Sequence, residues 1–207
     1  MKKTDKKYQA YIQILREELI PAMGCTEPIA LAYASAVARE ILGEMPDRVE
    51  VAASGSIIKN VKSVIVPHTG GLKGIAAAVA AGVVAGRADQ KLEVIAEVSQ
   101  GQTEEIRDFL QTVPVSISHV DRGFPFEIVV VLHKGSSYAK ARILNYHTNI
   151  VLLEKNGETL REVPVEGEKE EGITDRSLLD MESIYDFADT VEIGDIRDIL
   201  NRQISYN

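Results

Sequence analysis

Polar side chains and glycines are concentrated in one short stretch, residues 54–74. Gly70 and Gly71 can adopt backbone angles that are closed to other residues, and a helix is expected to begin near Leu72. The free N–H groups at such a helix start attract a carboxylate or a phosphate, and Lys73 adds positive charge there. The pattern therefore predicts a site for a small anionic group. The alternative, which the local pattern leaves open, is an ordinary loop whose polar residues are solvated or cap helices. The polar residues of the stretch are Ser54, Ser56, Asn60, Lys62, His68, Thr69 and Lys73.

The only cysteine of the sequence, Cys25, lies just before a second predicted helix, for which Thr26 is a suitable N-cap. A helix N-terminus favours the thiolate, the form that binds metals and attacks electrophiles. No Cys-x-x-Cys or histidine-rich spacing accompanies Cys25, so the sequence contains no complete metal site. The alternative is that this lone cysteine is a small buried hydrophobic residue.

Three further histidines, His119, His133 and His147, lie on or beside predicted strands. We expect each of them to be a sheet-surface or core residue rather than a ligand.

Composition and charge favour a soluble globular protein without a nucleic-acid or membrane partner. The 207 residues are enough for a large core in one domain or two, and 45% of them are hydrophobic. The net charge of −8 lacks the basic footprint that nucleic acid and anionic membranes require. No apolar segment typical of a secretory signal follows the basic start, and the apolar run at 75–85 is too short to span a bilayer. A single cysteine excludes an internal disulfide and fits a cytoplasmic location.

Hydrophobic periodicity predicts an α+β fold, made of buried helices that carry the site and a smaller antiparallel sheet. The expected helices cover residues 5–20, 26–42, 72–86, two segments within 89–111 (the second capped by Thr103) and two segments within 177–204. The expected strands cover residues 48–54, 63–67, 113–120, 126–133, 138–146, 148–154 and 159–163. Asn156-Gly157 predicts a tight hairpin turn between the last two strands.

These elements suggest two parts of the chain. The first part, residues 1–90, is helical and carries the candidate site, and the helices within 170–207 are expected to return to it. The second part, residues 91–169, contains helices and the antiparallel sheet. The charged segment 166–172 is expected to be a linker.

Four motifs appear in a fixed order along the sequence. They are Pro21-Ala-Met-Gly-Cys-Thr-Glu-Pro28, Ser54-Gly-Ser with Asn60, Pro67-His-Thr-Gly-Gly-Leu-Lys-Gly74, and His147-Thr-Asn149. Together they resemble the L-cysteine desulfidase branch of the iron–sulfur L-serine dehydratase family, over essentially the whole chain. The resemblance implies β-elimination from a small L-amino acid without pyridoxal phosphate. L-Cysteine would give pyruvate, ammonia and sulfide, and L-serine would give pyruvate and ammonia.

The resemblance also implies a cofactor, a [4Fe-4S] cluster, and a role for several residues. Cys25 resembles one of three cysteine ligands of the cluster, whose open iron binds the substrate while a base removes the α-proton. The residues that resemble part of the amino-acid pocket are Ser54, Gly55, Ser56 and Asn60. The residues that resemble the loop for the substrate carboxylate are His68, Thr69, Gly70 and Gly71. His68 is the candidate for proton transfer, or for a hydrogen bond to the substrate in a fixed tautomer.

The sequence departs from the family in its length and in its cysteines. Family chains are considerably longer, and their other cluster cysteines belong to a second half. One thiolate cannot hold a cluster that needs three, so we expect this chain alone to be inactive and cluster-free. It would be the N-terminal portion of a longer enzyme, or one chain of a split enzyme.

The expected partners are a small L-amino acid, the missing C-terminal half or a second chain, and further copies in a homo-oligomer. Two alternatives stay open: a non-catalytic amino-acid-binding module and a structural assembly partner. The sequence does not decide between cysteine, serine or another β-substituted amino acid as the substrate.

Overall fold

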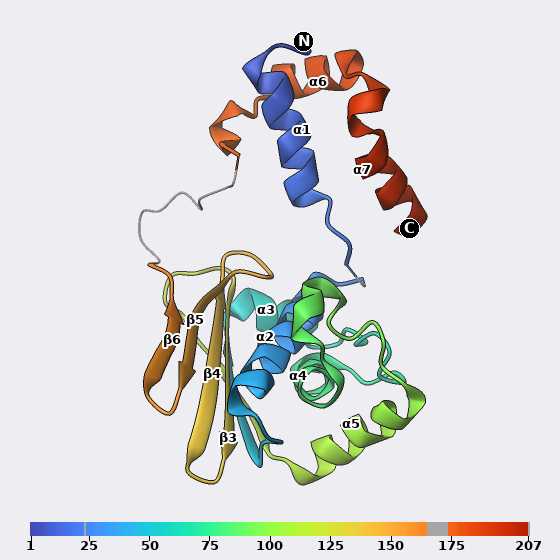
Figure 1. The fold of residues 1–207 in the computed structure, drawn as a ribbon. Helices are drawn as coiled ribbons and strands as arrows, with labels where there is room; N and C mark the ends of the chain where they lie inside the picture. Colours follow the sequence, from blue (N-terminus) through green and yellow to red (C-terminus); the bar gives the residue numbers. More distant parts are fainter. Residues whose placement is uncertain (23, 165–173, 207) are drawn as a thin grey trace. The chain divides into compact units, whose positions relative to one another are not determined.

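The chain forms two compact units in the computed structural model (Figure 1). The helical unit comprises Met1–Pro21 and Glu166–Asn207, and the sheet unit comprises Ala22–Val165. The structure describes residues 1–22, 24–164 and 174–206. The charged segment expected to be a linker, 166–172, lies outside the described residues.

The two units divide the chain differently from the expected parts at 1–90 and 91–169. The expected boundary would separate β1 (Arg48–Ala53) from β2 (Val115–His119) and β3 (Glu127–Lys134), with which β1 pairs. Interstrand hydrogen bonds need both partners, so the sheet keeps these distant segments in one unit.

In the described part of the chain, six strands form one sheet in the order β2-β1-β3-β4-β5-β6. An antiparallel meander runs from β3 through β4 (Ser137–Leu144) and β5 (Ile150–Lys155) to β6 (Glu158–Glu162). The expected turn at Asn156-Gly157 joins β5 to β6, and both of its residues have positive φ.

The pairing of β1 with β2 is parallel, whereas β1 pairs with β3 in the antiparallel sense. Parallel neighbours need a crossover connection, and the chain between β1 and β2 forms one from helices. The α+β class is therefore confirmed, but the expectation of an entirely antiparallel sheet is wrong at this pair. A consequence is that the carboxyl ends of β1 and β2 lie at the same edge of the sheet.

Helices cover one face of this sheet in successive layers (Figure 1). α2 (Thr26–Leu42) packs directly on β3 and β4, α4 (Gly74–Ala85) packs on α2, and α5 (Gln100–Thr112) packs on α4. Two short helices, α3 (Gly55–Val61) and the 3-10 helix η1 (Ala88–Glu93), lie in the connections. No helix in the described segments is long and apolar enough to cross a membrane.

Two helix caps differ from the sequence prediction. Cys25, not Thr26, is the N-cap residue of α2, although its side chain makes no capping hydrogen bond. Ser99, not Thr103, caps α5 through a capping box with Gln102. In this motif the serine hydroxyl and the glutamine side chain each bind a backbone N–H of the other residue, which satisfies two unpaired donors at once.

The polar stretch 54–74 also differs, because it contains α3 as well as a loop. The expected strand at 63–67 makes only one bridge, between Ile65 and Lys73, and the Ile65 side chain is exposed. The following helix, α4, begins at Gly74 rather than near Leu72.

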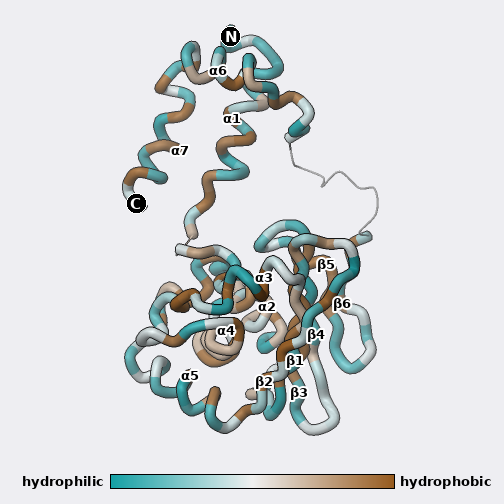
Figure 2. Tube along the Cα trace, turned by 180° about the vertical axis from the view of Figure 1, so that it is seen from behind, coloured by the Kyte–Doolittle hydropathy of each residue, from teal (hydrophilic) through white to brown (hydrophobic). Residues whose placement is uncertain are grey.

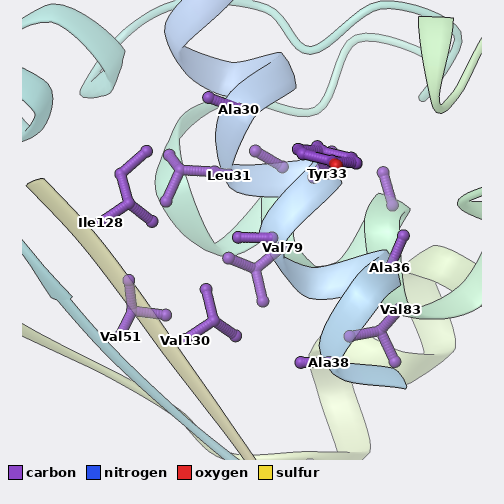
Figure 3. Packing of buried hydrophobic residues seen from close by; sticks show 14 of the residues in the cluster. Ala30, Leu31, Tyr33, Ala36, Ala38, Val51, Val79, Val83, Ile128 and Val130 are labelled. Carbon is purple, nitrogen blue, oxygen red and sulfur yellow. The ribbon is translucent and has the colours of Figure 1, made fainter. Parts of the chain in front are cut away.

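The contact between α2 and α4 depends on small residues. A Cβ atom built on Gly82 of α4 would lie 2.1 Å from the backbone oxygen of Ala32 in α2, so the two backbones touch. Leu31 on the same helix points toward Ile128 of the sheet (Figure 3). In Figure 2, which views α4 nearly end-on, the visible turns of the helix are white to light brown and none is strongly hydrophilic, in agreement with its burial between neighbouring helices.

The helical unit consists of α1 (Lys6–Glu18), the 3-10 helix η2 (Arg176–Leu178), α6 (Met181–Thr190) and α7 (Ile193–Tyr206). Its core, separate from that of the sheet unit, holds Phe187 with the rings of Tyr8 and Tyr11 edge-on at centroid distances of 5.4 and 5.2 Å. The N-terminal ammonium group lies 2.8 Å from a carboxylate oxygen of Asp186. Segments from the two ends of the sequence therefore build this unit together.

We predict that Gly82→Ala destabilises the protein, because the added methyl group would overlap the backbone of α2. Overpacking of this kind costs about 1–3 kcal/mol, and here the atom in the way is backbone, so we expect about 2 kcal/mol or more. Urea denaturation followed by circular dichroism measures the change. Gly101→Ala in α5 is the matched control, since a Cβ atom there meets nothing within 4 Å. Equal stability of the two variants would contradict the close contact.

Candidate functional site

Ser54 follows β1 and is the N-cap residue of α3. Its hydrogen bonds join the start of β3 to the end of β1. Its backbone N–H donates to the Glu127 carbonyl at 2.9 Å, and its Oγ accepts from the Glu127 N–H at 3.2 Å. The Ser54 hydroxyl donates to the carbonyl of Pro125 at 2.8 Å. Since its single hydrogen is used in this way, the buried Ser54 shapes the site and has no hydrogen left for a ligand.

Ser56, in the first turn of α3, also donates its hydroxyl hydrogen to the Pro125 carbonyl, and its Oγ lies 3.2 Å from that of Ser54. Unlike Ser54, Ser56 is exposed to solvent. The two serines thus bind one carbonyl and leave the oxygen of Ser56 on the surface as an acceptor.

A pocket of about 340 Å³ opens beside these serines. It lies just beyond the carboxyl ends of the parallel strands β1 and β2, a position where ligands bind in many sheets that contain parallel strands. The lining residues are Ser54, Gly55, Ser56, His119, Val120, Asp121, Gly123, Phe124 and Pro125. The pocket therefore includes three of the residues predicted to bind an amino acid, together with His119, which the sequence suggested was a sheet residue.

An ion cluster around the buried Glu127 supports the segment that forms one wall of the pocket. Glu127 is fully buried. Its Oε1 accepts a hydrogen bond from Arg122 and lies 2.8 and 2.9 Å from two nitrogen atoms of the Arg142 guanidinium. The Arg142 guanidinium also lies 5.8 Å from the ring centroid of Phe124, which lines the pocket. Among the described residues, Glu127 Oε2 has no hydrogen-bond partner.

A second polar cluster joins Cys25 and Asn60 through Glu27. The Cys25 thiol donates to Glu27 Oε2 at 3.1 Å, and the Asn60 amide donates to Glu27 Oε1 at 3.1 Å. Although partial burial opposes it, hydrogen bonds from Cys25, from the Glu27 backbone and from Asn60 hold the pKa of Glu27 below its usual range. Glu27 is therefore a carboxylate that accepts from both side chains at neutral pH.

The expectation that Cys25 favours its thiolate form is not met. Cys25 is exposed, but partial shielding of its sulfur from water raises the pKa of the thiol, and the hydrogen bond to the negatively charged Glu27 raises it further. Losing the proton would place two negative charges side by side. The helix N-terminus, which attracts anions, is outweighed here by a closer carboxylate.

His147, in the turn between β4 and β5, lies at the edge of this cluster. Its ring contacts that of Phe126 edge-on at a centroid distance of 4.6 Å. Burial lowers the pKa of His147, and the attraction of Glu27 opposes that shift only in part. His147 is therefore neutral at pH 7 and can accept as well as donate a hydrogen bond.

One face of α3 connects the pocket with the Glu27 cluster. Ser56 and Asn60 are four residues apart and lie on the same side of the helix, about 6 Å apart along its axis. Phe126, which contacts His147, directly follows Pro125, which binds both serines. α3 and the segment with Pro125 and Phe126 therefore each contribute to both polar groups.

The loop with His68 has a constrained backbone. His68, Gly70 and Gly71 have φ values of 59°, 65° and 89°, and a positive φ is uncommon for a residue other than glycine. The His68 Nδ1 atom lies 2.8 Å from the carbonyl oxygen of Ala96. Since a carbonyl only accepts, Nδ1 carries a proton, and Nε2 takes no part in this hydrogen bond.

Hydrogen bonds hold this loop against α5. The Thr103 hydroxyl lies 3.3 Å from the His68 carbonyl, and Arg107 donates to the Gly70 carbonyl at 3.0 Å. Thr69 is fully buried, and its hydroxyl donates to the Val66 carbonyl at 2.8 Å, so it stabilises the loop from within. Gly71 has open space beside it.

The predicted site residues thus fall into three groups. Ser54, Gly55 and Ser56 line the pocket, Cys25 and Asn60 meet at Glu27, and residues 68–71 lie against α5. Among the described residues, no hydrogen bond links the third group to the other two. Nor do these residues contain a group of three or more His, Cys, Asp or Glu side chains that could hold a metal ion.

The sequence reasoning missed the roles of Glu27 and His119. Glu27 lies in the motif around Cys25, but the motif itself did not indicate which side chains Glu27 joins. His119 is the last residue of β2, and its importance depends on β2 lying parallel to β1. The signal that could have revealed it is the crossover connection, which places both strand ends at one edge.

The chain is similar over its length to proteins named UPF0597. One from Desulfitobacterium hafniense is 49% identical over 210 residues, which is 100% of this chain and 48% of the relative. Relatives from Treponema denticola and Lachnoclostridium phytofermentans are 43% and 44% identical over 97% of the chain, again covering 47% and 48% of those proteins. The chain therefore spans about half the length of the curated relatives it matches. No family model matches the chain, and no solved structure matches it.

We predict that Glu27→Gln makes Cys25 more reactive. Removing the carboxylate charge lowers the pKa of the thiol, so more thiolate is present at a given pH and alkylation is faster. The rate of iodoacetamide labelling, followed by mass spectrometry as a function of pH, should show its midpoint at lower pH than in the wild type. Glu50→Gln, which removes a carboxylate on β1, serves as the control. A midpoint that stays in place or moves to higher pH would exclude Glu27 as the cause.

Proposed function

We propose that this chain is the N-terminal portion of an iron–sulfur-dependent lyase that carries out β-elimination on a small L-amino acid. The observation that supports this most directly is the meeting of motif residues at Glu27. Cys25, Asn60 and His147 belong to three of the four motifs, are far apart in the sequence, and all interact with one carboxylate. A chance group of surface residues would not draw on the same motifs that carry the family resemblance.

The proposed reaction on L-cysteine releases sulfide, pyruvate and ammonia, and on L-serine it releases pyruvate and ammonia. In this reaction His68 removes the α-proton with Nε2, because Nδ1 is already bound to the Ala96 carbonyl. The exposed oxygen of Ser56 and the amide of Asn60 would help orient the amino acid along α3. Glu27 would hold Asn60 in place through its hydrogen bond.

The cofactor implied by the resemblance does not fit this chain alone. A [4Fe-4S] cluster held by three thiolates needs three cysteines, and the sequence has one. Cys25 is exposed and can supply one ligand, and the rest would come from the part of a longer protein or second chain that this sequence lacks. We therefore assign no reaction step to the cluster here.

The proposed partners follow from the lengths of the relatives and from the surface of the helical unit. A protein as long as the curated relatives would contain as many residues again, and these would complete the site. On α6, Met181, Ile184 and Tyr185 form an apolar stripe with exposures of 81%, 41% and 78%. Large exposed apolar groups of this kind favour association, so we include a homo-oligomer in the proposal.

A non-catalytic amino-acid-binding module is the second candidate function. The pocket at Ser56 favours it, because all of the pocket's lining residues belong to this chain. Such a module would bind an amino acid without a cluster and without turnover.

The test uses the complete gene product that contains this sequence, reconstituted anaerobically with iron and sulfide. Pyruvate and sulfide are measured with L-cysteine and L-serine as substrates. We expect His68→Gln to lower kcat about 100-fold or more, as for loss of a general base, while cluster content is unchanged. Cys25→Ser should lower the cluster content itself. His133→Gln, a histidine on β3, is the control and should retain activity.

Two results would count against the proposal. One is full turnover and full cluster content in both the His68 and the Cys25 variants, which would refute the roles assigned to these two residues. The other is a reconstituted wild type that binds L-cysteine or L-serine but forms no pyruvate, which would favour the binding module.

A further inference from the structure

Gly55, at the start of α3, is a glycine that the backbone does not require. Its φ is not in the left-handed region, and glycine in a helix is about 1 kcal/mol less favourable than alanine. A Cβ atom at this position would lie 3.5 Å from Nε2 of His119. The missing side chain therefore leaves open the space between α3 and the His119 ring, which is the space of the pocket.

The side of the pocket opposite α3 is formed by residues at the end of β2 and just beyond it, and their backbone is hydrogen-bonded. His119 pairs with Ala53 of the parallel strand β1, and the next residue, Val120, donates its N–H to the Ala53 carbonyl at 3.0 Å. Beyond it, the Gly123 N–H donates to Asp121 Oδ1 at 3.3 Å. The backbone of His119 is thus fixed at the end of a strand, and a fixed backbone suits a residue that binds a ligand.

The hydrogen-bonding capacity of the lining side chains points to His119. The hydroxyl hydrogens of Ser54 and Ser56 are both donated to the Pro125 carbonyl. Asp121 is an acceptor, and the remaining lining side chains are apolar or absent. His119 makes no side-chain hydrogen bond within the described part of the chain. It is therefore the lining side chain that still has a donor to offer, while Asp121 offers an acceptor.

We propose that His119 is a ligand-binding residue that donates a hydrogen bond to the carboxylate of a small amino acid in this pocket. Asp121 faces the same space as an acceptor for the ammonium group, so the pocket suits a zwitterion. The choice of an amino acid as the ligand rests on the proposed function. The assignment of His119 rests on the pocket and holds for a binding module as well as for a lyase.

The experiment measures binding to the 207-residue chain by isothermal titration calorimetry, with L-serine and with L-serinamide, which lacks the carboxylate. A hydrogen bond to a charged group is strong, so His119→Ala should weaken L-serine binding about tenfold. Binding of L-serinamide should change less than about twofold, because the group that His119 binds is missing from it. His119→Gln, which keeps a donor, should recover part of the loss.

Two further variants make the test independent of a folding defect. Ser118→Ala, next to His119 on β2 and on the opposite side of the strand, is the matched control and should bind L-serine like the wild type. Gly55→Ala should keep the thermal stability of the chain, since the backbone accepts alanine there, but should weaken L-serine binding by reducing the space beside His119.

Three results would overturn the proposal. They are wild-type affinity for L-serine in His119→Ala, an equal loss for L-serine and L-serinamide, and no binding of L-serine by the wild type at millimolar concentration. These results are distinct from failure of the proposed function. If the complete gene product shows no turnover, the assignment of His119 as a binding residue still stands. If the complete gene product is a lyase and His119→Ala leaves its affinity for L-serine unchanged, only the assignment of His119 is refuted.

Discussion

The close approach of α2 and α4 is the constraint on which the sheet unit depends. Gly82 lets the two backbones touch at Ala32, and any larger residue would force them apart. α2 begins at the segment with Cys25 and Glu27, whereas α4 begins just after the loop with His68. The separation of these two groups is therefore fixed by helix packing rather than by the loops themselves. Small residues here therefore set where the two helix starts lie.

Ser54 has a comparable role at the edge of the sheet. Through its backbone and its hydroxyl it joins β1, the start of α3 and the residues before β3. The pocket and the Glu27 cluster both depend on this junction, since one face of α3 carries Ser56 and Asn60. The buried pair of Arg142 with Glu127 stabilises the same region from the other side of the chain. The Ser54 hydroxyl is paired both as a donor and as an acceptor, which favours a rigid junction, whereas Glu127 Oε2 has no partner among the described residues.

The sequence predicted those features that depend on local pattern. The helical spacing of apolar residues in α1, the apolar composition of α2 and α4 and the turn at Asn156-Gly157 were visible because each is set by neighbours in the chain. The α+β class followed from them. The parallel pairing of β1 with β2 could not be predicted in this way, because it depends on how a long crossover packs.

The site was only partly predictable, for the same reason. Motif residues identified Cys25, Asn60 and Ser56 as candidates, but not that Glu27 joins the first two. The protonation of Cys25 was misjudged because a helix start is visible in the sequence, whereas the distance from a thiol to a carboxylate is not. The position of His119 beside the pocket depends on tertiary structure alone. Residues whose role depends on one distant contact are thus the ones that sequence patterns miss.

The composition of the helical unit has a consequence for how the chain folds during synthesis. α1 precedes the sheet unit in the sequence, whereas its packing partners, α6 and α7, follow that unit. The segments of the sheet unit are contiguous in sequence, so this unit can become ordered before α6 and α7 are made. Until then the apolar face of α1 stays uncovered. Contacts between such distant segments form late because a long loop must close first. A chaperone that shields nascent amphipathic helices would therefore find a target in α1 until α6 and α7 have been made.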